Sequence, residues 1–230
     1  PFSRTFGIKP LSFIENKKEI NQIINDFNSD FPLSYSYFIT GLRGTGKTVL
    51  LTSISKELAK KDNWIVVDIN PERSILEQVA GGILSNNFVK KNFIKKEFSF
   101  SFHGLGLSIE GDNPVSDIVS LVKKMLEILK KHNKKLLICI DEVSNTENIR
   151  TFVLDYQIFL RSEYKIYLLM TGLNNNVTSL QNHKNLTFLL RTPKIILGVL
   201  NKDLIKRNYQ EIFNIADDEN LLLIDTKDLK

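Results

Sequence analysis

Cysteine is almost absent from this chain of 230 residues, which contains only Cys139. A single cysteine cannot form an intramolecular disulfide, so a disulfide framework is excluded, and this usage is typical of a reducing compartment. Long apolar runs are also missing: none approaches the roughly 20 residues of a membrane-spanning helix, and the opening PFSRTFGIKPLSF lacks the continuous apolar stretch of a signal peptide. We therefore expect a cytoplasmic protein with no membrane contact.

Histidine is scarce as well. The three histidines, His103, His132 and His183, show no metal-ligand spacing, and the apolar neighbours of Cys139 favour an inert core thiol over a nucleophile.

Hydrophobic residues make up 42% of the chain and charged residues 25%, which is ordinary for one globular α/β domain of this length. The net charge of +5 permits an anionic partner, but a nucleotide alone would satisfy it, so nucleic acid is allowed and not required.

Apolar runs of strand length alternate with segments of helical periodicity along most of the chain. Strands are predicted at 36–40, 64–69, 136–140, 165–170 and 195–197, and helices at 47–60, from about 71 to 83, 114–131 and 151–161. The helical pattern after 71 weakens at Gly81 and Gly82. The run LLICI at 136–140 is apolar throughout, as expected for a strand covered on both faces. This alternation predicts an α/β fold with a mainly parallel sheet and right-handed crossovers.

One stretch, KEFSFSFHGLGLSIEG, breaks this alternation. Apolar residues alternate with serine or glycine on both sides of residues 103–104, which predicts an inserted β-hairpin near 97–110 with a two-residue turn. The expected cross-strand pairs are Phe102 with Leu105, Phe100 with Leu107, and Phe98 with Ile109.

The segment GLRGTGKT at 41–48 matches the pattern G-x-x-x-x-G-K-[ST]. Its glycines permit the tight turns that direct backbone N–H groups at a phosphate. Lys47 adds a charge that reaches the β- and γ-phosphates, and the Thr48 hydroxyl can ligate Mg²⁺. A predicted strand before the segment and a helix after it supply the context that the motif needs. The predicted nucleotide contacts are Gly41, Leu42, Arg43, Gly44, Thr45, Gly46, Lys47, Thr48 and Val49.

A second motif, LLICIDEV at 136–143, ends a buried strand with two acidic residues. Asp141 is the candidate to support Mg²⁺ together with Thr48. Glu142 can polarise an attacking water, which indicates hydrolysis rather than transfer to a substrate hydroxyl. The alternative is that the two acids merely cap the next helix. Residues 201–204, NKDL, differ from the guanine-reading N-K-x-D at the last position, so adenine is favoured.

The order TFG, GLRGTGKTVLL, WIVVDI, ICIDEV and YLLMTGL, over roughly residues 5–200, resembles the AAA+ ATPases, and more narrowly their prokaryotic branch related to replication-initiator and STAND-type ATPases. The resemblance implies a three-layer P-loop NTPase fold with the sheet order 5-1-4-3-2, and ATP with Mg²⁺ as ligands. It also implies a polar sensor at the end of the fourth strand. This sensor falls on Thr171, with Asn174 as the alternative, and Thr171 joins Glu142 and Lys47 in the predicted catalytic set.

The resemblance further implies a nucleotide-binding core over 1–200 and the start of a truncated helical lid over 201–230. The Gly-Arg pair that is usual near the adenine is replaced by FIEN at 13–16. An arginine finger from a neighbouring subunit would stabilise the transferring phosphoryl charge. The candidate adenine contacts are Phe6, Gly7, Ile8 and Ile14, and the candidate fingers are Arg150, Arg161, Arg191 and Arg207.

We therefore predict an ATP-binding protein that hydrolyses ATP to drive a conformational change in a protein partner or through self-association. One alternative is a signalling switch with little turnover. Another is a DNA-stimulated ATPase, since FVKKNFIKKEF at 88–98 interleaves phenylalanines and lysines in a way that could stack bases and hold phosphates. A helix end with solvated lysines is the favoured interpretation of that stretch. A P-loop kinase would need an acceptor-binding lid, and Glu142 argues against it.

Overall fold

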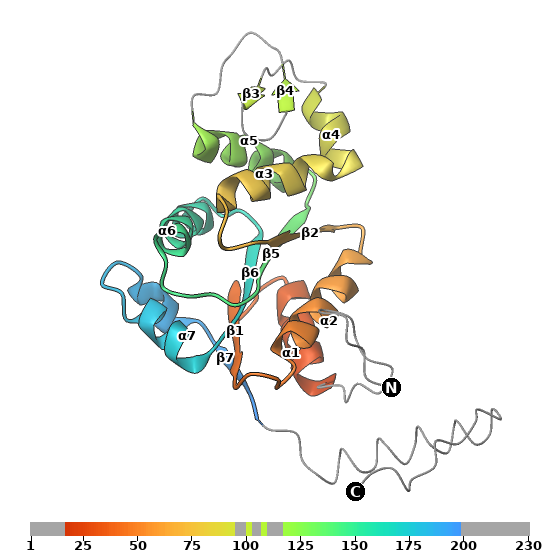
Figure 1. Cartoon of the computed structure of the whole chain (residues 1–230). Helices are drawn as coiled ribbons and strands as arrows, with labels where there is room; N and C mark the ends of the chain where they lie inside the picture. Colours follow the sequence, from red (N-terminus) through yellow and green to blue (C-terminus); the bar gives the residue numbers. More distant parts are fainter. Residues whose placement is uncertain (1–16, 95–99, 103–106, 110–116, 199–230) are drawn as a thin grey trace, which may run out of the picture.

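The computed structural model describes residues 17–94, 100–102, 107–109 and 117–198, and its centre is a five-stranded parallel sheet (Figure 1). The strands are β1 (Ser36–Gly41), β2 (Trp64–Ile69), β5 (Lys135–Ile140), β6 (Ile166–Gly172) and β7 (Lys194–Leu197). They lie in the order β2-β5-β6-β1-β7, and every pairing is parallel. Counted from the β7 edge, this is the order 5-1-4-3-2, so the predicted fold is confirmed.

Helices cover both faces of the sheet and complete the three-layer arrangement (Figure 1). One face carries α1 and α2, the other carries α3, α5, α6 and α7, and α4 packs against α3 and α5. The helices are α1 (Lys17–Asn28), α2 (Lys47–Ala59), α3 (Ile75–Ser85), α4 (Asn87–Ile94), α5 (Ile118–Lys131), α6 (Glu147–Arg161) and α7 (Asn174–Gln181), followed by a 3-10 helix, η1 (Thr187–Arg191).

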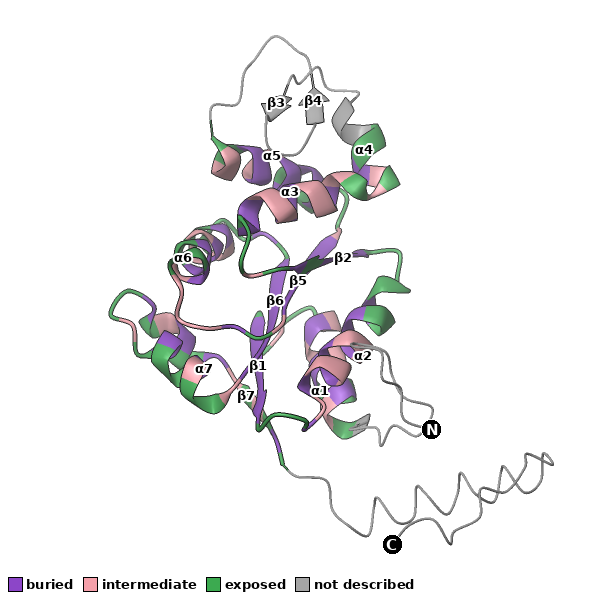
Figure 2. Ribbon diagram, viewed as in Figure 1, coloured by how far each residue is buried: buried purple, intermediate pink, exposed green. Residues whose placement is uncertain are grey.

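Strands β1, β5 and β6 are buried on both faces, as Figure 2 shows. In β5, Leu137 and Cys139 join the core under α1 and α2, whereas Leu136, Ile138 and Ile140 join the core under α3, α5 and α6. This two-sided burial explains why the strand sequence is continuously apolar rather than alternating.

Two helices begin at capping residues and not at the positions expected from periodicity. α6 begins at Glu147, before the predicted 151, because the Thr146 hydroxyl accepts the backbone N–H three residues on at 3.4 Å. α5 begins at Ile118, after the predicted 114, because the Asp117 carboxylate accepts the N–H three residues on, also at 3.4 Å. Both caps satisfy amides that would otherwise lack a partner at the helix start.

α3 continues through Gly81 and Gly82, where the sequence pattern had indicated a weakening. A Cβ on Gly82 would lie 2.4 Å from Cγ1 of Val67, so the glycine is what allows α3 to pack closely against β2. Gly81 has open space around its Cα. The glycine pair is therefore a packing feature of this helix and not its end.

The predicted hairpin is present between α4 and α5 as β3 (Phe100–Phe102) and β4 (Leu107–Ile109), but its predicted register is wrong. Phe102 pairs with Leu107 and Phe100 pairs with Ile109, so the connection comprises residues 103–106 instead of a two-residue turn. The glycines at 104 and 106 lie between the two strands in the sequence, and glycine disfavours a strand, which fits the shift of two residues.

Several predictions concern residues outside the described ranges. These are the adenine contacts at 6–8 and 14, the finger candidate Arg207, the hairpin residues Phe98 and Leu105, and the lid start at 201–230. Within the described ranges, no helix is long and apolar enough to cross a membrane.

Candidate nucleotide site

The predicted site residues gather at one edge of the sheet, where β1, β5 and β6 end. β6 lies between β1 and β5, so the loop after β1, the end of β6 and the loop after β5 are neighbours. In parallel α/β sheets, ligands bind at the carboxyl ends of the strands. The fold therefore brings residues 41–48, residues 141–142 and Thr171 to one place.

The loop between β1 and α2 requires its glycines. Gly44 and Gly46 have φ values of 78° and 88°, in the left-handed region that costs little only for glycine. A Cβ on Gly41 would lie 2.6 Å from the Leu197 carbonyl oxygen and 2.7 Å from Thr45 Oγ1. No larger residue fits between this loop and the end of β7.

The loop presents hydrogen-bond donors at the start of α2. Gly46 is the N-cap and supplies no side-chain cap, and the amides of residues 46–49 donate no hydrogen bond to another described residue. Lys47 Nζ donates to the carbonyl oxygens of Leu42 (2.7 Å) and Gly41 (3.3 Å), which places the ammonium against the same loop. Unpaired amides at a helix start, together with an ammonium, suit a phosphate group.

Asp141 connects the start of α2 to β6. Thr48 Oγ1 donates to Asp141 Oδ2 at 2.8 Å, and Thr171 Oγ1 donates to Asp141 Oδ1. A carboxylate and a hydroxyl oxygen in contact at this position fit Mg²⁺, which prefers hard oxygen ligands and one or two protein groups beside phosphates. The described residues contain no cluster of three or more His, Cys, Asp or Glu that would suit a metal held by protein alone.

Glu142 has an unusual backbone. Its φ of 56° lies in the left-handed region, which costs a residue with a Cβ roughly 1–2 kcal/mol and occurs often at functional sites. The Glu142 N–H donates to Thr171 Oγ1 at 3.0 Å, and the next amide, Val143 N, donates to the Thr171 carbonyl at 2.8 Å. The Glu142 side chain is exposed and forms no hydrogen bond or ion pair with a described residue. Because Thr146 caps α6, the alternative that the acidic pair merely caps this helix is wrong.

Thr171 and Asn174, the two sensor candidates, differ in their contacts. Thr171 is fully buried, and its hydroxyl donates to Asp141 while accepting the Glu142 N–H. Asn174 is exposed at the first position of α7, and its side chain has no hydrogen bond to a described residue. The structure therefore brings Thr171, and not Asn174, into contact with the acidic pair.

A second link between the loop after β5 and α7 has no recognisable sequence motif. Asn145 Nδ2 donates to Ser179 O (3.2 Å) and Oγ (3.1 Å), and Arg150 Nη1 donates to Asn145 O (2.9 Å) and Oδ1 (3.1 Å). Arg150, a finger candidate, thus holds a loop of its own chain. Arg161 and Arg191, the other described candidates, are exposed.

One buried thiol lies near the site. Asp68 pairs with Cys139 across β2 and β5. Burial raises the pKa of Asp68, and a hydrogen bond from the Cys139 thiol lowers it in part. Burial, then the nearby Asp68 charge, raises the pKa of Cys139 well above its ordinary value, so the thiol stays protonated and is a poor nucleophile.

A parallel sheet in this strand order, with a glycine-rich loop and helix after β1 and an acidic residue after β5, defines the fold of the P-loop NTPases. No family model and no curated protein matches the chain.

Several solved structures have a fold similar to that of this chain. The chain is similar to Cdc6p from Pyrobaculum aerophilum, with 18% identity and a TM-score of 0.56 over 94% of this chain and 52% of that one. It is similar to ORC2 from Aeropyrum pernix in ADPNP-ADP complexes, with 17% identity and a TM-score of 0.58 over 96% and 56%. It is also similar to Drosophila ORC bound to DNA, with 16% identity and a TM-score of 0.58 over 89% and 47%.

The chain therefore shares the fold of these Cdc6 and ORC structures. It spans about half the length of these structures.

Proposed function

We propose that this chain binds ATP with Mg²⁺ and hydrolyses it, and that hydrolysis drives a conformational change in a partner protein or a second copy. The supporting observation is the hydrogen-bond series from Thr48 through Asp141 and Thr171 to the backbone of Glu142. It connects the phosphate-binding helix to a carboxylate that has no partner of its own among the described residues.

Each group of the candidate site has a distinct chemical task in this proposal. The amides of 46–49 and Lys47 hold the phosphates, and Thr48 with Asp141 would hold Mg²⁺, which when bound draws charge from the transferring phosphoryl group. Glu142 accepts a proton from the attacking water, as a general base does. Thr171 fixes the backbone at which the Glu142 carboxylate begins, so it acts by positioning.

A calorimetric titration tests nucleotide binding first. We expect Mg·ATP to bind the wild type, Lys47→Ala to lose binding, and Lys56→Ala, an exposed lysine of the same helix, to retain it. Mg·GTP should bind more weakly than Mg·ATP. Asp141→Asn should lower the dependence of binding on Mg²⁺. Failure of the wild type to bind Mg·ATP would contradict the proposal.

A nucleic-acid-stimulated ATPase is the second candidate, and the exposed Lys90 and Lys91 on α4 favour it. A similar structure, Drosophila ORC, is bound to DNA. Phe88 is not available for base stacking, because it packs on the core and edge-on against His132. Its ring centroid also lies 4.5 Å from Lys134 Nζ. Stimulation of turnover by duplex DNA that decreases with added salt, and is lost in a Lys90→Ala, Lys91→Ala variant, would support this candidate.

A further inference from the structure

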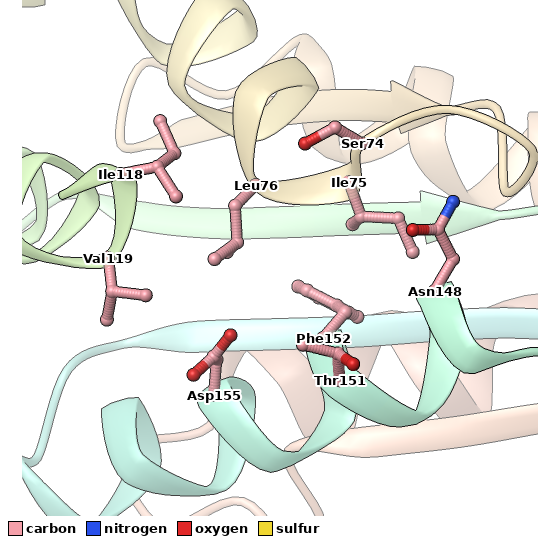
Figure 3. Close-up of a pocket in the computed structure, with 9 residues that line it drawn as sticks. All are labelled: Ser74, Ile75, Leu76, Ile118, Val119, Asn148, Thr151, Phe152 and Asp155. Atoms are coloured by element: carbon pink, nitrogen blue, oxygen red, sulfur yellow. The ribbon is translucent and has the colours of Figure 1, made fainter.

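A cavity of about 220 Å³ lies between α3, α5 and α6, on the face of the sheet opposite α2 (Figure 3). Apolar side chains from all three helices, including Leu76, Val119 and Phe152, form most of its wall. In Figure 3, Leu76 and Val119 point toward Asp155, whose carboxylate extends from α6 into the same space. The P-loop contributes no residue to this cavity, so it is separate from the candidate nucleotide site.

The size of the cavity restricts its occupant. It is smaller than the roughly 300–1,000 Å³ of sites for cofactors and drug-sized ligands. It is several times larger than the roughly 30 Å³ that one water occupies in the liquid. A single long side chain with an apolar stem fits such a volume.

The charge of the cavity decides the chemistry of that side chain. Asp155 is half-buried and forms no hydrogen bond or ion pair with another described residue. Burial raises the pKa of Asp155, the Asp117 carboxylate raises it further, and Lys123 opposes both. A cation placed in the cavity would give Asp155 the partner that a partly desolvated carboxylate needs.

An anionic occupant is disfavoured although helix starts border the cavity. Ser74 precedes α3, and Ile118 begins α5, so both helix dipoles are favourable to negative charge here. Two carboxylates already lie near the cavity: Asp155 in its wall, from the middle of α6, and Asp117 as the cap of α5. Adding a third negative charge would repel both, whereas a cation is attracted to both.

We propose that this pocket, called here the Asp155 pocket (the cavity between α3, α5 and α6), receives the side chain of an arginine or lysine from a partner protein. The aliphatic stem would lie against Leu76, Val119 and Phe152, and the cationic end would contact the Asp155 carboxylate. Long basic side chains bury their stems on apolar surface in this way. The inference does not depend on ATP binding or hydrolysis.

Methyl-detected NMR titration of the full chain tests this assignment, with acetyl-Gly-Arg-Gly-amide as the probe. Citrulline is a neutral isostere of arginine, so the matching citrulline peptide isolates the effect of charge. With the arginine peptide, we expect saturable shifts at the methyl groups of Leu76 and Val119. The citrulline and glutamate peptides should bind with an affinity lower by at least about tenfold.

Variants and a free amine complete the test. Asp155→Asn should weaken the arginine peptide about tenfold. Val119→Phe should weaken it by filling the pocket, and Glu147→Gln, an exposed acid of the same helix outside the pocket, should leave it unchanged. Absence of saturable shifts, equal binding of the citrulline peptide, or full binding by Asp155→Asn would overturn the proposal. Spermidine binding more tightly than the arginine peptide would overturn the assignment to a protein side chain.

Discussion

Replacement of Thr171 by valine tests whether one buried hydroxyl positions both acidic residues of the site. Valine has nearly the same shape, so the change removes a donor to Asp141 and an acceptor of the Glu142 N–H without opening a cavity. A hydrogen bond to a charged group contributes about 1.5–3 kcal/mol and a neutral one about 0.5–1.5 kcal/mol. Thr171 is 0% exposed, so water cannot replace the lost hydroxyl. We expect the free energy of unfolding, measured by urea titration, to fall by about 2–4 kcal/mol.

The same substitution should lower ATP turnover beyond any loss of folded protein. The Glu142 backbone would lose the contact that holds its left-handed conformation, and a displacement of about 1 Å at a catalytic group can reduce a rate about 100-fold. We expect the turnover number of Thr171→Val to fall about 10–100-fold under conditions in which the variant is folded. Thr171→Ser keeps the hydroxyl and should retain most of the activity.

A matched control is available at the opposite edge of the sheet. Thr192 is also buried, and its hydroxyl pairs with Ser36 Oγ at 2.9 Å, far from the P-loop in the chain's topology. Thr192→Val should reduce stability by about 1 kcal/mol and leave turnover per folded molecule unchanged. Wild-type turnover in Thr171→Val, or an equal loss of turnover in Thr192→Val, would contradict the positioning role of Thr171.

Three further predictions concern stability. Thr40→Val should raise the melting temperature, because the buried Thr40 hydroxyl has no hydrogen-bond partner among the described residues; a drop would contradict this. Gly82→Ala should destabilise by about 1–3 kcal/mol through contact with Val67, while Gly81→Ala, where space is open, should stabilise by up to about 1 kcal/mol, both read from urea unfolding. Burial, then a hydrogen bond to a glutamate of α5, raises the pKa of Tyr164 to about 12 from 10.0. A pKa that is higher in the folded state contributes stability that is present below pH 10 and is lost as the pH rises toward 12. Tyr164→Phe should therefore make the free energy of unfolding decline less between pH 10 and 12. An unchanged decline would contradict this prediction.

The strand order was expected from the resemblance to the AAA+ ATPases, whereas the location of the candidate site was predictable from strong local signals. The continuous apolar run before Asp141 and the glycine pattern before Lys47 each require a buried parallel strand followed by a turn. Once both strands are placed in one parallel sheet, their carboxyl ends must meet at one edge. Thr171 was predicted from the resemblance instead, and it lies near the end of β6, the strand between them.

Helix boundaries, the hairpin register and the local links around Glu142 were not predictable, because each depends on a single side chain or on tertiary packing. α6 and α5 begin at positions other than those expected from periodicity, because Thr146 and Asp117 accept hydrogen bonds from the amides of the first helical turn. The apolar pattern of the sequence does not reveal these hydrogen bonds. The reason for a glycine at position 82 appears only in the packing of α3 against β2, where a Cβ would contact Val67. The contact of Arg150 with Asn145 joins residues whose spacing matches no known motif.

The proposed ATPase activity can be tested by comparing ATP turnover in the wild type and in Glu142→Gln, after confirmation that both bind Mg·ATP. Glutamine keeps the size of the side chain but cannot accept a proton from water, so turnover should be lost while binding is retained. Glu147→Gln, an exposed acid at the start of α6, should turn over ATP at the wild-type rate. Equal turnover in the wild type and Glu142→Gln would contradict the assigned role of Glu142, and negligible turnover in both, with tight binding, would indicate a nucleotide-dependent switch instead of an ATPase.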